Sequence, residues 1–151
     1  MALVEWRTSF NTGIDVIDGQ HRQLVEMINR LHQASSEQIR DVLLDLIDYT
    51  ESHYAFEETL MEDAGYPFCK AHKRVHESFI KRVAGYKRRF DEGENIAEEL
   101  TGVLSRWLVH HIKNDDAAYA ADVKANLNRL THDRSSEGWL ARSLHRFFGH
   151  R

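Results

Sequence analysis

Four long segments of the chain place apolar residues three or four positions apart, which is the spacing of one face of an α-helix. The first helix is expected from Asp18, which can cap its N-terminus, to about Gln33. The second is expected from a cap at Ser36 to the residue before Ala64, where a turn sequence follows. The inward faces of these two helices would carry His21, Leu24, Met27 or Ile28, Leu31, Leu43, Leu46, Ile47, Thr50, His53, Glu57, Leu60 and Met61.

The third helix is expected from about Phe68 to Phe90, and the fourth after Asn95, which has capping-box spacing with Glu98. A further helical piece is expected at about residues 117–130, and residues 1–17 are expected to form an arm that lies across the helices. The inward faces would carry His72, Val75 or His76, Phe79, Ile80, Val83, Tyr86, Phe90, Ile96, Leu100, Val103, Leu104, Trp107 and His111. Short connections between such helices predict an all-α fold, an antiparallel up-down-up-down four-helix bundle.

Composition narrows the class of protein. The chain has 151 residues, of which 42% are hydrophobic and 29% charged, which fits one globular domain with a substantial core. The net charge of −4 argues against a nucleic-acid partner. The single cysteine, Cys69, excludes an intrachain disulfide. Neither a signal-peptide pattern nor a membrane-spanning apolar run is present, so a cytoplasmic location is expected.

The C-terminal end differs in character from the rest. Residues 1–131 are expected to form the bundle, and 132–151 a linker followed by a tail. The linker, 132–138, is polar and rich in serine. The tail, 139–151, reads as a short basic amphipathic helix that could bind a protein partner or a membrane surface, or could fold back over the bundle. Its apolar face would carry Trp139, Leu140, Leu144, Phe147 and Phe148.

Histidines and acidic residues interrupt the apolar faces at helical spacing. His53 and Glu57 are four residues apart, as are His72 and His76, and such pairs differ by only about 40° around a helix axis. In an up-down-up-down bundle, both pairs fall at the same end as the start of the first helix and the end of the fourth. The candidates that meet there are His21, His53, Glu57, His72, His76, His111, Asp115 and Asp116.

This grouping predicts a metal site. An ionised Glu57 in an apolar core is costly unless it is paired or bound to a metal. Imidazoles and carboxylates without thiolates suit iron, zinc, copper or manganese. The number of candidate ligands exceeds what one tetrahedral ion needs, which favours two ions bridged by carboxylates. Taken singly, His21 could be a core histidine and each spaced pair a surface pair of its helix, but their convergence favours the metal.

The same residues form motifs that resemble the hemerythrin family. The segments His53–Glu57 (HYAFE), His72–His76 (HKRVH) and Trp107–Asp116 (WLVHHIKNDD) look like its signature. Trp6 and the segment Ile17–His21 (IDGQH) are similar to the bacterial branch, the bacteriohemerythrins. The resemblance covers about residues 4–130 and implies the same four-helix bundle.

The resemblance implies a site with two non-haem iron ions, joined by a solvent-derived oxo or hydroxo bridge, that binds O2 reversibly. By resemblance, one iron would be held by His72, His76 and His111. The other would be held by His21 and His53, and would keep one position open for O2. Glu57 and Asp116 would bridge the two ions. The family spacing selects His111 over His110 and Asp116 over Asp115, a choice that helix periodicity leaves open.

The resemblance also implies an apolar pocket for O2, formed by Trp107, Leu108 and Ile112. These side chains would exclude water and proton donors from the site, although ordinary core packing explains them equally well. Tyr119 is expected to serve packing only, and Cys69 to lie at the boundary of the core.

The leading hypothesis is therefore an O2-binding protein that carries, stores or supplies oxygen and is not primarily an enzyme. One alternative is a sensor of O2 or redox state that acts through a separate partner. Another is a di-iron enzyme that handles peroxide or nitric oxide. The oligomeric state is not predicted.

Overall fold

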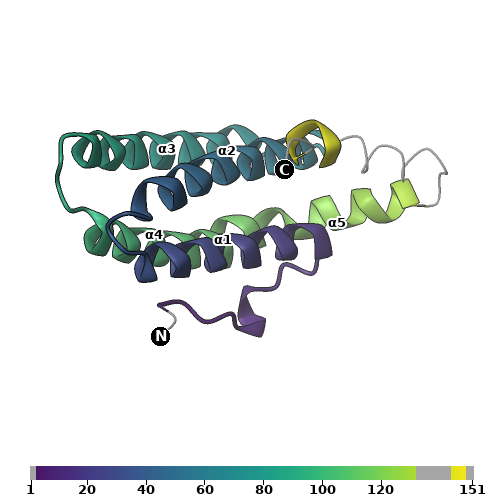
Figure 1. Ribbon diagram of the computed structural model, residues 1–151. Helices are drawn as coiled ribbons and strands as arrows, with labels where there is room; N and C mark the ends of the chain where they lie inside the picture. The colour runs from purple at the N-terminus through teal and green to yellow at the C-terminus, as the bar shows by residue number, and fades with distance from the viewer. Residues whose placement is uncertain (1–2, 132–143, 149–151) are drawn as a thin grey trace.

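The computed structural model describes residues 3–131 and 144–148, and places side chains for residues 3–126 and 144–148. All regular structure within these residues is helical (Figure 1). The first four elements along the chain are η1 (Thr8–Phe10), α1 (Asp15–Gln33), α2 (Ile39–Asp63) and α3 (Cys69–Asp91). They are followed by α4 (Ala97–His111), the π-helical segment η2 (Ile112–Asp116) and α5 (Ala117–Thr131).

The helices form the predicted four-helix bundle. α1 packs against α2 and α4, and α2 packs against α3 (Figure 1). The fourth helix is longer than predicted, because α4 runs through η2 directly into α5. Among the described helices, none combines the length and apolar character that crossing a membrane requires.

The predicted cap at Asp18 is wrong, because α1 begins three residues earlier, at Asp15. The Asp18 carboxylate instead accepts hydrogen bonds from the backbone N–H groups of Thr12 and Gly13, at 2.7 and 3.2 Å. Gly13 has a φ of +86°, which L side chains rarely adopt, and so allows the tight turn into α1. Asp18 therefore fastens the N-terminal arm to the helix that follows it.

Two further predicted caps are also wrong. α2 begins at Ile39, and the turn before it starts from Ser35, whose backbone N–H donates to Gln38 Oε1 at 3.1 Å. α4 begins at Ala97, and its N-terminus carries no side-chain cap, so no capping box forms at Asn95. Ile96, which is fully buried, anchors this helix start by packing. A local turn at Ser35 therefore replaces the predicted cap of α2, and packing of Ile96 replaces that of α4.

An asparagine of α1, Asn29, helps to hold the start of the N-terminal arm along the bundle. Asn29 Oδ1 accepts hydrogen bonds from the backbone N–H groups of Leu3 and Val4, and Asn29 Nδ2 donates to the carbonyl of Val4. Val4 and Phe10 of the arm are buried in the main core. The arm thus closes the outer side of α1 and η2, as its apolar residues predicted (Figure 1).

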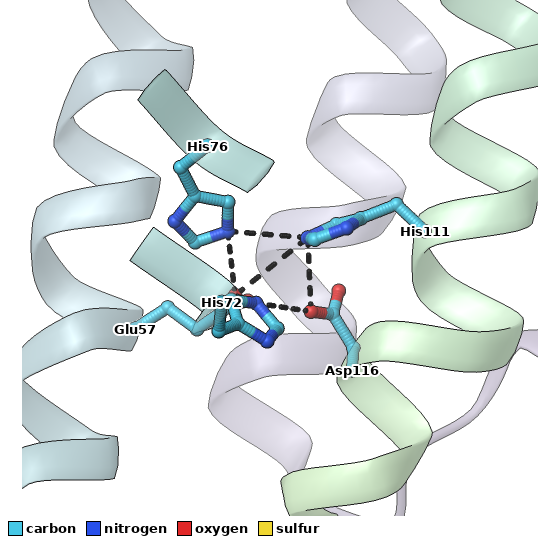
Figure 2. A group of neighbouring side chains, drawn as sticks. All are labelled: Glu57, His72, His76, His111 and Asp116. Atoms are coloured by element: carbon cyan, nitrogen blue, oxygen red, sulfur yellow. Dashed lines mark hydrogen bonds and ion pairs between the residues drawn. The ribbon is translucent and has the colours of Figure 1, made fainter. Parts of the chain in front are cut away.

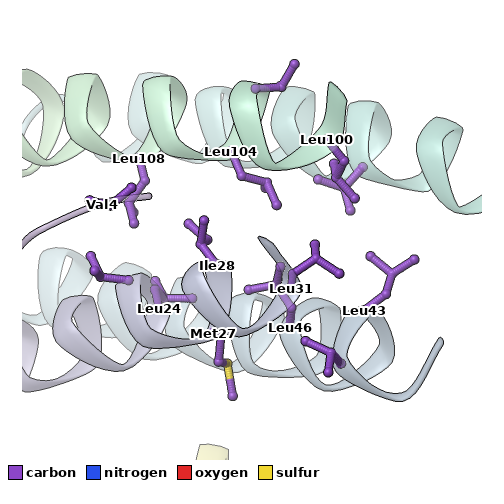
Figure 3. Close-up of a cluster of buried hydrophobic side chains, with 14 of the residues drawn as sticks. Val4, Leu24, Met27, Ile28, Leu31, Leu43, Leu46, Leu100, Leu104 and Leu108 are labelled. Atoms are coloured by element: carbon purple, nitrogen blue, oxygen red, sulfur yellow. The ribbon is translucent and has the colours of Figure 1, made fainter. Parts of the chain in front are cut away.

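Two apolar clusters make up the described core. The larger one fills the half of the bundle around the α1–α2 and α3–α4 connections and reaches to Leu108 and Ile112 (Figure 3). Its side chains include Leu31, Leu43, Leu46, Leu100 and Leu104. The smaller cluster lies at the opposite end and consists of Ile14, Ile17, Phe56, Leu60, Met61, Tyr119 and Val123.

Part of the C-terminal tail packs back onto the bundle. Residues 144–148 are helical, and their apolar side chains contact the smaller cluster. Phe147 and Phe148 lie with ring centroids 6.3 and 5.8 Å from that of Phe56, and Phe148 also contacts Tyr49. This agrees with the folded-back alternative for these residues. The predicted linker 132–138 and the tail residues 139–143 and 149–151 lie outside the described residues.

Candidate metal centre

The structure brings all seven predicted ligands together. His21 comes from α1, His53 and Glu57 from α2, and the remaining side chains are His72 and His76 of α3, His111 of α4 and Asp116 of η2. Their ligand atoms fall into two overlapping groups, one of Glu57, His72, His76, His111 and Asp116, the other of His21, His53 and Glu57. Figure 2 shows the first group, whose side chains converge from three helices.

The cluster is a buried polar layer between the two apolar clusters. On α1, His21 lies between Ile17 of the smaller cluster and Leu24 of the larger one. His21, Glu57 and Asp116 have no exposed surface at all. Apolar packing on both sides excludes water, so these ionisable groups have only one another and any bound ion to compensate their burial.

The π-helical segment explains how His111 and Asp116 face the same point. In a regular α-helix, residues five apart differ by roughly 140° around the axis, so they would point in different directions. The wider turn of η2 removes most of that difference, and His111 Nε2 lies 3.1 Å from Asp116 Oδ1. Single π-turns within α-helices are frequent at functional sites.

Glu57 divides its two oxygen atoms between the two groups of histidines. Its Oε1 lies 2.8 Å from His72 Nε2 and 3.1 Å from His76 Nε2. Its Oε2 lies 3.1 Å from His53 Nε2 and 3.7 Å from His21 Nε2. One carboxylate therefore serves two separate sets of imidazoles.

Asp116 divides its oxygen atoms in the same way. Its Oδ1 lies 3.1 Å from both His72 Nε2 and His111 Nε2, whereas its Oδ2 lies 3.0 Å from His21 Nε2. Each of the two carboxylates therefore lies between a set of three histidines and a pair of histidines, where it could contact an ion held by either.

The atoms point toward common centres more than toward one another. Although they are this close, His21 Nε2 and both oxygen atoms of Asp116 have no hydrogen-bond partner with acceptable geometry among the described residues. Atoms that bind one ion at about 2.0–2.2 Å lie about 3 Å apart when they are neighbours around it. The observed spacings match that value, so the donor set fits metal ions.

Two acceptors orient imidazoles from outside the cluster, and the sequence did not identify them. His53 Nδ1 lies 2.6 Å from Gln20 Oε1, and His111 Nδ1 lies 2.8 Å from Asp115 Oδ2. Glu58 Oε1 lies 3.6 Å from His76 Nδ1, which is too far for a hydrogen bond, and His76 Nδ1 has no hydrogen-bond partner among the described residues. An acceptor on Nδ1 places the proton there and leaves Nε2 free as a ligand atom. The i,i+4 spacing of His111 and Asp115 was the available signal for one of these pairs.

Tyr119 does more than the packing that the sequence predicted. Its hydroxyl donates a hydrogen bond to Glu57 Oε2 at 3.1 Å, and the side chain is fully buried. Burial, with the nearby charge of Glu57, raises the pKa of Tyr119 well above its usual value, so the hydroxyl keeps its proton. This hydrogen bond holds one of the two carboxylate oxygens of Glu57 in place.

In the absence of a metal, protons bound to some of the histidines help to stabilise the cluster. Burial works to lower the pKa of His21, but the facing carboxylates of Asp116 and Glu57 raise it to about 9. The same balance raises the pKa of His72 to about 9, whereas burial prevails at His53 and lowers its pKa. Burial opposes ionisation of Glu57, yet the surrounding imidazoles hold its pKa well below the usual value. A metal would therefore displace protons from histidines and meet ionised carboxylates.

Aromatic rings support the histidines from the side of the larger cluster. The ring of Trp107 is stacked between those of Phe79 and His111, with centroid distances of 3.7 and 4.5 Å. The ring of Tyr54 is stacked on that of His76 at 3.8 Å. Trp107 thus contacts a candidate ligand directly, as a pocket wall would.

A small cavity lies beside these rings. Its volume is about 10 Å³, and Trp107 and Leu108 are among the side chains that line it, together with Leu24, Ile28, Leu46, Thr50, Tyr54, Phe79 and Leu104. Ile112, the third predicted pocket residue, is buried in the same apolar cluster but does not line this cavity. The cavity is almost wholly apolar, which suits a small uncharged molecule.

The residues that the sequence assigned no ligand role lie elsewhere. His32, His110 and His145 are exposed, whereas His132 and His150 lie outside the described residues. Cys69 is partly buried against the smaller cluster, as predicted, and burial raises the pKa of its thiol.

Known proteins are similar to this chain in sequence. Residues 12–123 match the family described as the hemerythrin HHE cation-binding domain. A bacteriohemerythrin of Stenotrophomonas maltophilia is 58% identical, and one of Pseudomonas aeruginosa is 54% identical, each over 99% of this chain and 100% of the relative. A bacteriohemerythrin of Methylococcus capsulatus is 33% identical over 83% of this chain and all of its own length.

A solved structure extends the likeness to three dimensions. A crystal structure of wild-type hemerythrin is similar with a TM-score of 0.77 and 32% identity, over 81% of this chain and 98% of that one. Residues 12–123, which match the family, include every member of the buried histidine and carboxylate cluster. The chain therefore belongs to the hemerythrin family, with a bacteriohemerythrin sequence along almost its whole length.

Proposed function

We propose that this protein binds O2 reversibly at a centre of two non-haem iron ions and acts as an oxygen carrier, store or local supplier. The arrangement of Glu57 and Asp116 carries this proposal, because each carboxylate turns one oxygen to each group of histidines. A single ion could use the carboxylate oxygens that face one group of histidines, but not those that face the other.

In the proposed centre, His72, His76 and His111 hold one iron, and His21 and His53 hold the other. Glu57 and Asp116 would each turn one carboxylate oxygen to either ion, and a solvent-derived oxo or hydroxo group would be expected between the ions. The ion held by His21 and His53 would have one histidine fewer than the other, which would leave room for O2 there. When bound, the two iron ions supply two electrons to O2 and recover them on its release.

The chain supports that chemistry by orientation and by exclusion of water. Gln20 and Asp115 hold the Nδ1 protons of His53 and His111, which directs Nε2 of each ring to the centre. Trp107 and Leu108 form an apolar wall beside the histidines. That wall keeps out the water and proton donors that would promote irreversible oxidation of the site.

The deciding experiment is a metal and O2 titration of the whole chain. Bound metal is quantified, the protein is reduced without oxygen, and visible spectra are recorded while O2 is added and removed. We expect two irons per chain and an absorption band that appears with O2 and disappears without it. Absence of iron after reconstitution would overturn the di-iron assignment.

The same titration separates the rival functions. Two irons that oxidise irreversibly, with no stable O2 complex, would favour redox sensing or catalysis over oxygen binding. Turnover of peroxide or nitric oxide well above that of free iron would favour an enzyme. The cytoplasmic location and a partner of the tail stay predictions.

A further inference from the structure

Tyr54 places a hydroxyl group in the apolar core without a visible use for it. The side chain is buried, and its hydroxyl has no hydrogen-bond partner among the described residues. The other two buried tyrosines differ in this respect, because Tyr119 donates to Glu57 and Tyr86 donates to Glu99, at 3.1 and 3.3 Å. A buried hydroxyl without a partner destabilises a fold, and phenylalanine would fill the same space without that cost.

The position of Tyr54 indicates what the hydroxyl could serve. Its ring is stacked on His76 at 3.8 Å and is nearly parallel to it, with an interplanar angle of 4°. The Trp107 ring is 6.0 Å away, and the His111 ring 6.3 Å. Tyr54 also follows His53 directly in the chain, so it is adjacent to candidate ligands of both irons.

The cavity beside the site adds a second, independent observation. Tyr54 is one of its lining residues, together with the pocket residues Trp107 and Leu108. A volume of about 10 Å³ is close to the smallest that admits one molecule of the size of water. The remaining lining is aliphatic or aromatic except for Thr50, whose hydroxyl already donates to the carbonyl of Leu46 at 2.7 Å. Tyr54 is therefore the lining side chain whose hydroxyl is still available to a ligand.

We propose that the Tyr54 hydroxyl donates a hydrogen bond to the small ligand held in the pocket beside the metal centre, and that this bond slows the ligand's release. The inference rests on the proposed function, since it assigns a residue of the same site. Binding of O2 shifts negative charge onto the ligand, and a hydrogen bond to a charged acceptor is stronger than one to a neutral acceptor. Tyr54 would thus supply the hydrogen bond in a pocket whose other hydroxyl, that of Thr50, already donates to the backbone.

The test is the variant Tyr54→Phe, compared with wild type both without iron and with two irons. Without iron, removal of the unpaired hydroxyl is expected to raise the thermal midpoint by about 2–5 °C. With iron, O2 release from the reduced protein is expected to be about tenfold faster. Azide, a small anionic probe, is expected to bind the oxidised protein about tenfold more weakly.

The matched control is Tyr86→Phe, which removes the partly buried hydroxyl of another core tyrosine, in the far half of the bundle. We expect its thermal midpoint to stay equal or fall, and its O2 release and azide affinity to equal those of wild type. Wild-type O2 release and azide affinity in Tyr54→Phe would overturn the proposal, whatever the thermal midpoint. If wild type bound azide but not O2, the proposed function would fail, and the azide comparison would still decide the role of Tyr54.

Discussion

The two halves of the bundle are built by the same helices but have opposite interiors. Away from the metal centre, α1, α2 and α4 bring together mainly apolar side chains, such as Leu31, Leu43 and Leu100 (Figure 3). Two or three turns along the same helices, the inward positions become histidines and carboxylates (Figure 2). Both interiors are almost completely buried.

The comparison shows that burial of side chains affects the stability of the fold in opposite ways in the two halves. Burial of leucines in the far half stabilises the fold by itself, since apolar surface leaves water. Burial of Glu57, Asp116 and their imidazoles opposes folding unless protons or metal ions compensate the charges. The far half can therefore hold the helices in register, whereas the near half depends on what is bound there.

Replacing Glu57 should have the largest effect of any single change in the near half. In Glu57→Gln, we expect iron to fall from two ions per chain to one or none, because a bridging oxygen and a charge are lost. The thermal midpoint of the protein purified with iron should then approach that of the iron-free wild type. Metal analysis and calorimetry measure both effects. Glu51→Gln, at an exposed position of the same helix, is the control and should keep two irons.

A pair of leucines on α4 compares the halves directly. Leu100 lies in the far half and Leu108 beside the cavity, and both are buried. Each change to alanine should cost about 2–5 kcal/mol of unfolding free energy through cavity formation. Only Leu108→Ala should also speed oxidation of the O2-loaded site, which is followed by loss of its absorption band. Equal oxidation rates in the two variants would contradict the proposal that Leu108 protects the O2 pocket.

Much of this architecture could be predicted from the sequence because it depends on periodicity. Residues four apart share a helix face, so the pairs His53 with Glu57 and His72 with His76 were recognisable before the structure. Short connections then placed these pairs at one end of the bundle. The bundle itself follows from the same apolar period, and the structure confirms it.

What the sequence could not predict depends on departures from that period. A regular helix would turn Asp115, not Asp116, toward the point that His111 faces, and only the π-turn exchanges their roles. The motif resemblance favoured Asp116, but it offered no physical reason. The caps failed for a related reason, because packing of Ile96 and the turn around Ser35 fixed the helix starts instead of the nearby capping residues.

Stability against pH should separate the iron-free from the iron-loaded protein. The folded chain raises the pKa of His21 and His72 from 6.5 to about 9, so both stabilise the fold fully below about pH 6.5. That contribution is lost as the pH rises through about 9. The thermal midpoint of the iron-free protein should therefore fall between these values. With iron bound, the ligand nitrogen atoms carry no proton, so this fall should be absent. An equal fall in both forms would contradict the assignment.

Two adjacent aspartates should differ in their effect on iron binding. We expect the smallest effect of the changes considered from Asp115→Asn, and a large one from Asp116→Asn. Asp115 Oδ2 accepts the hydrogen bond of His111 Nδ1 from outside the cluster and is partly exposed, whereas Asp116 is fully buried among the histidines. Asp115→Asn keeps an acceptor but removes the charge, so we expect two irons per chain that are lost to a chelator about 10–100 times more readily. Asp116→Asn should fail to retain two irons at all. Similar iron retention in the two variants would mean that the π-turn does not decide which aspartate serves the metal.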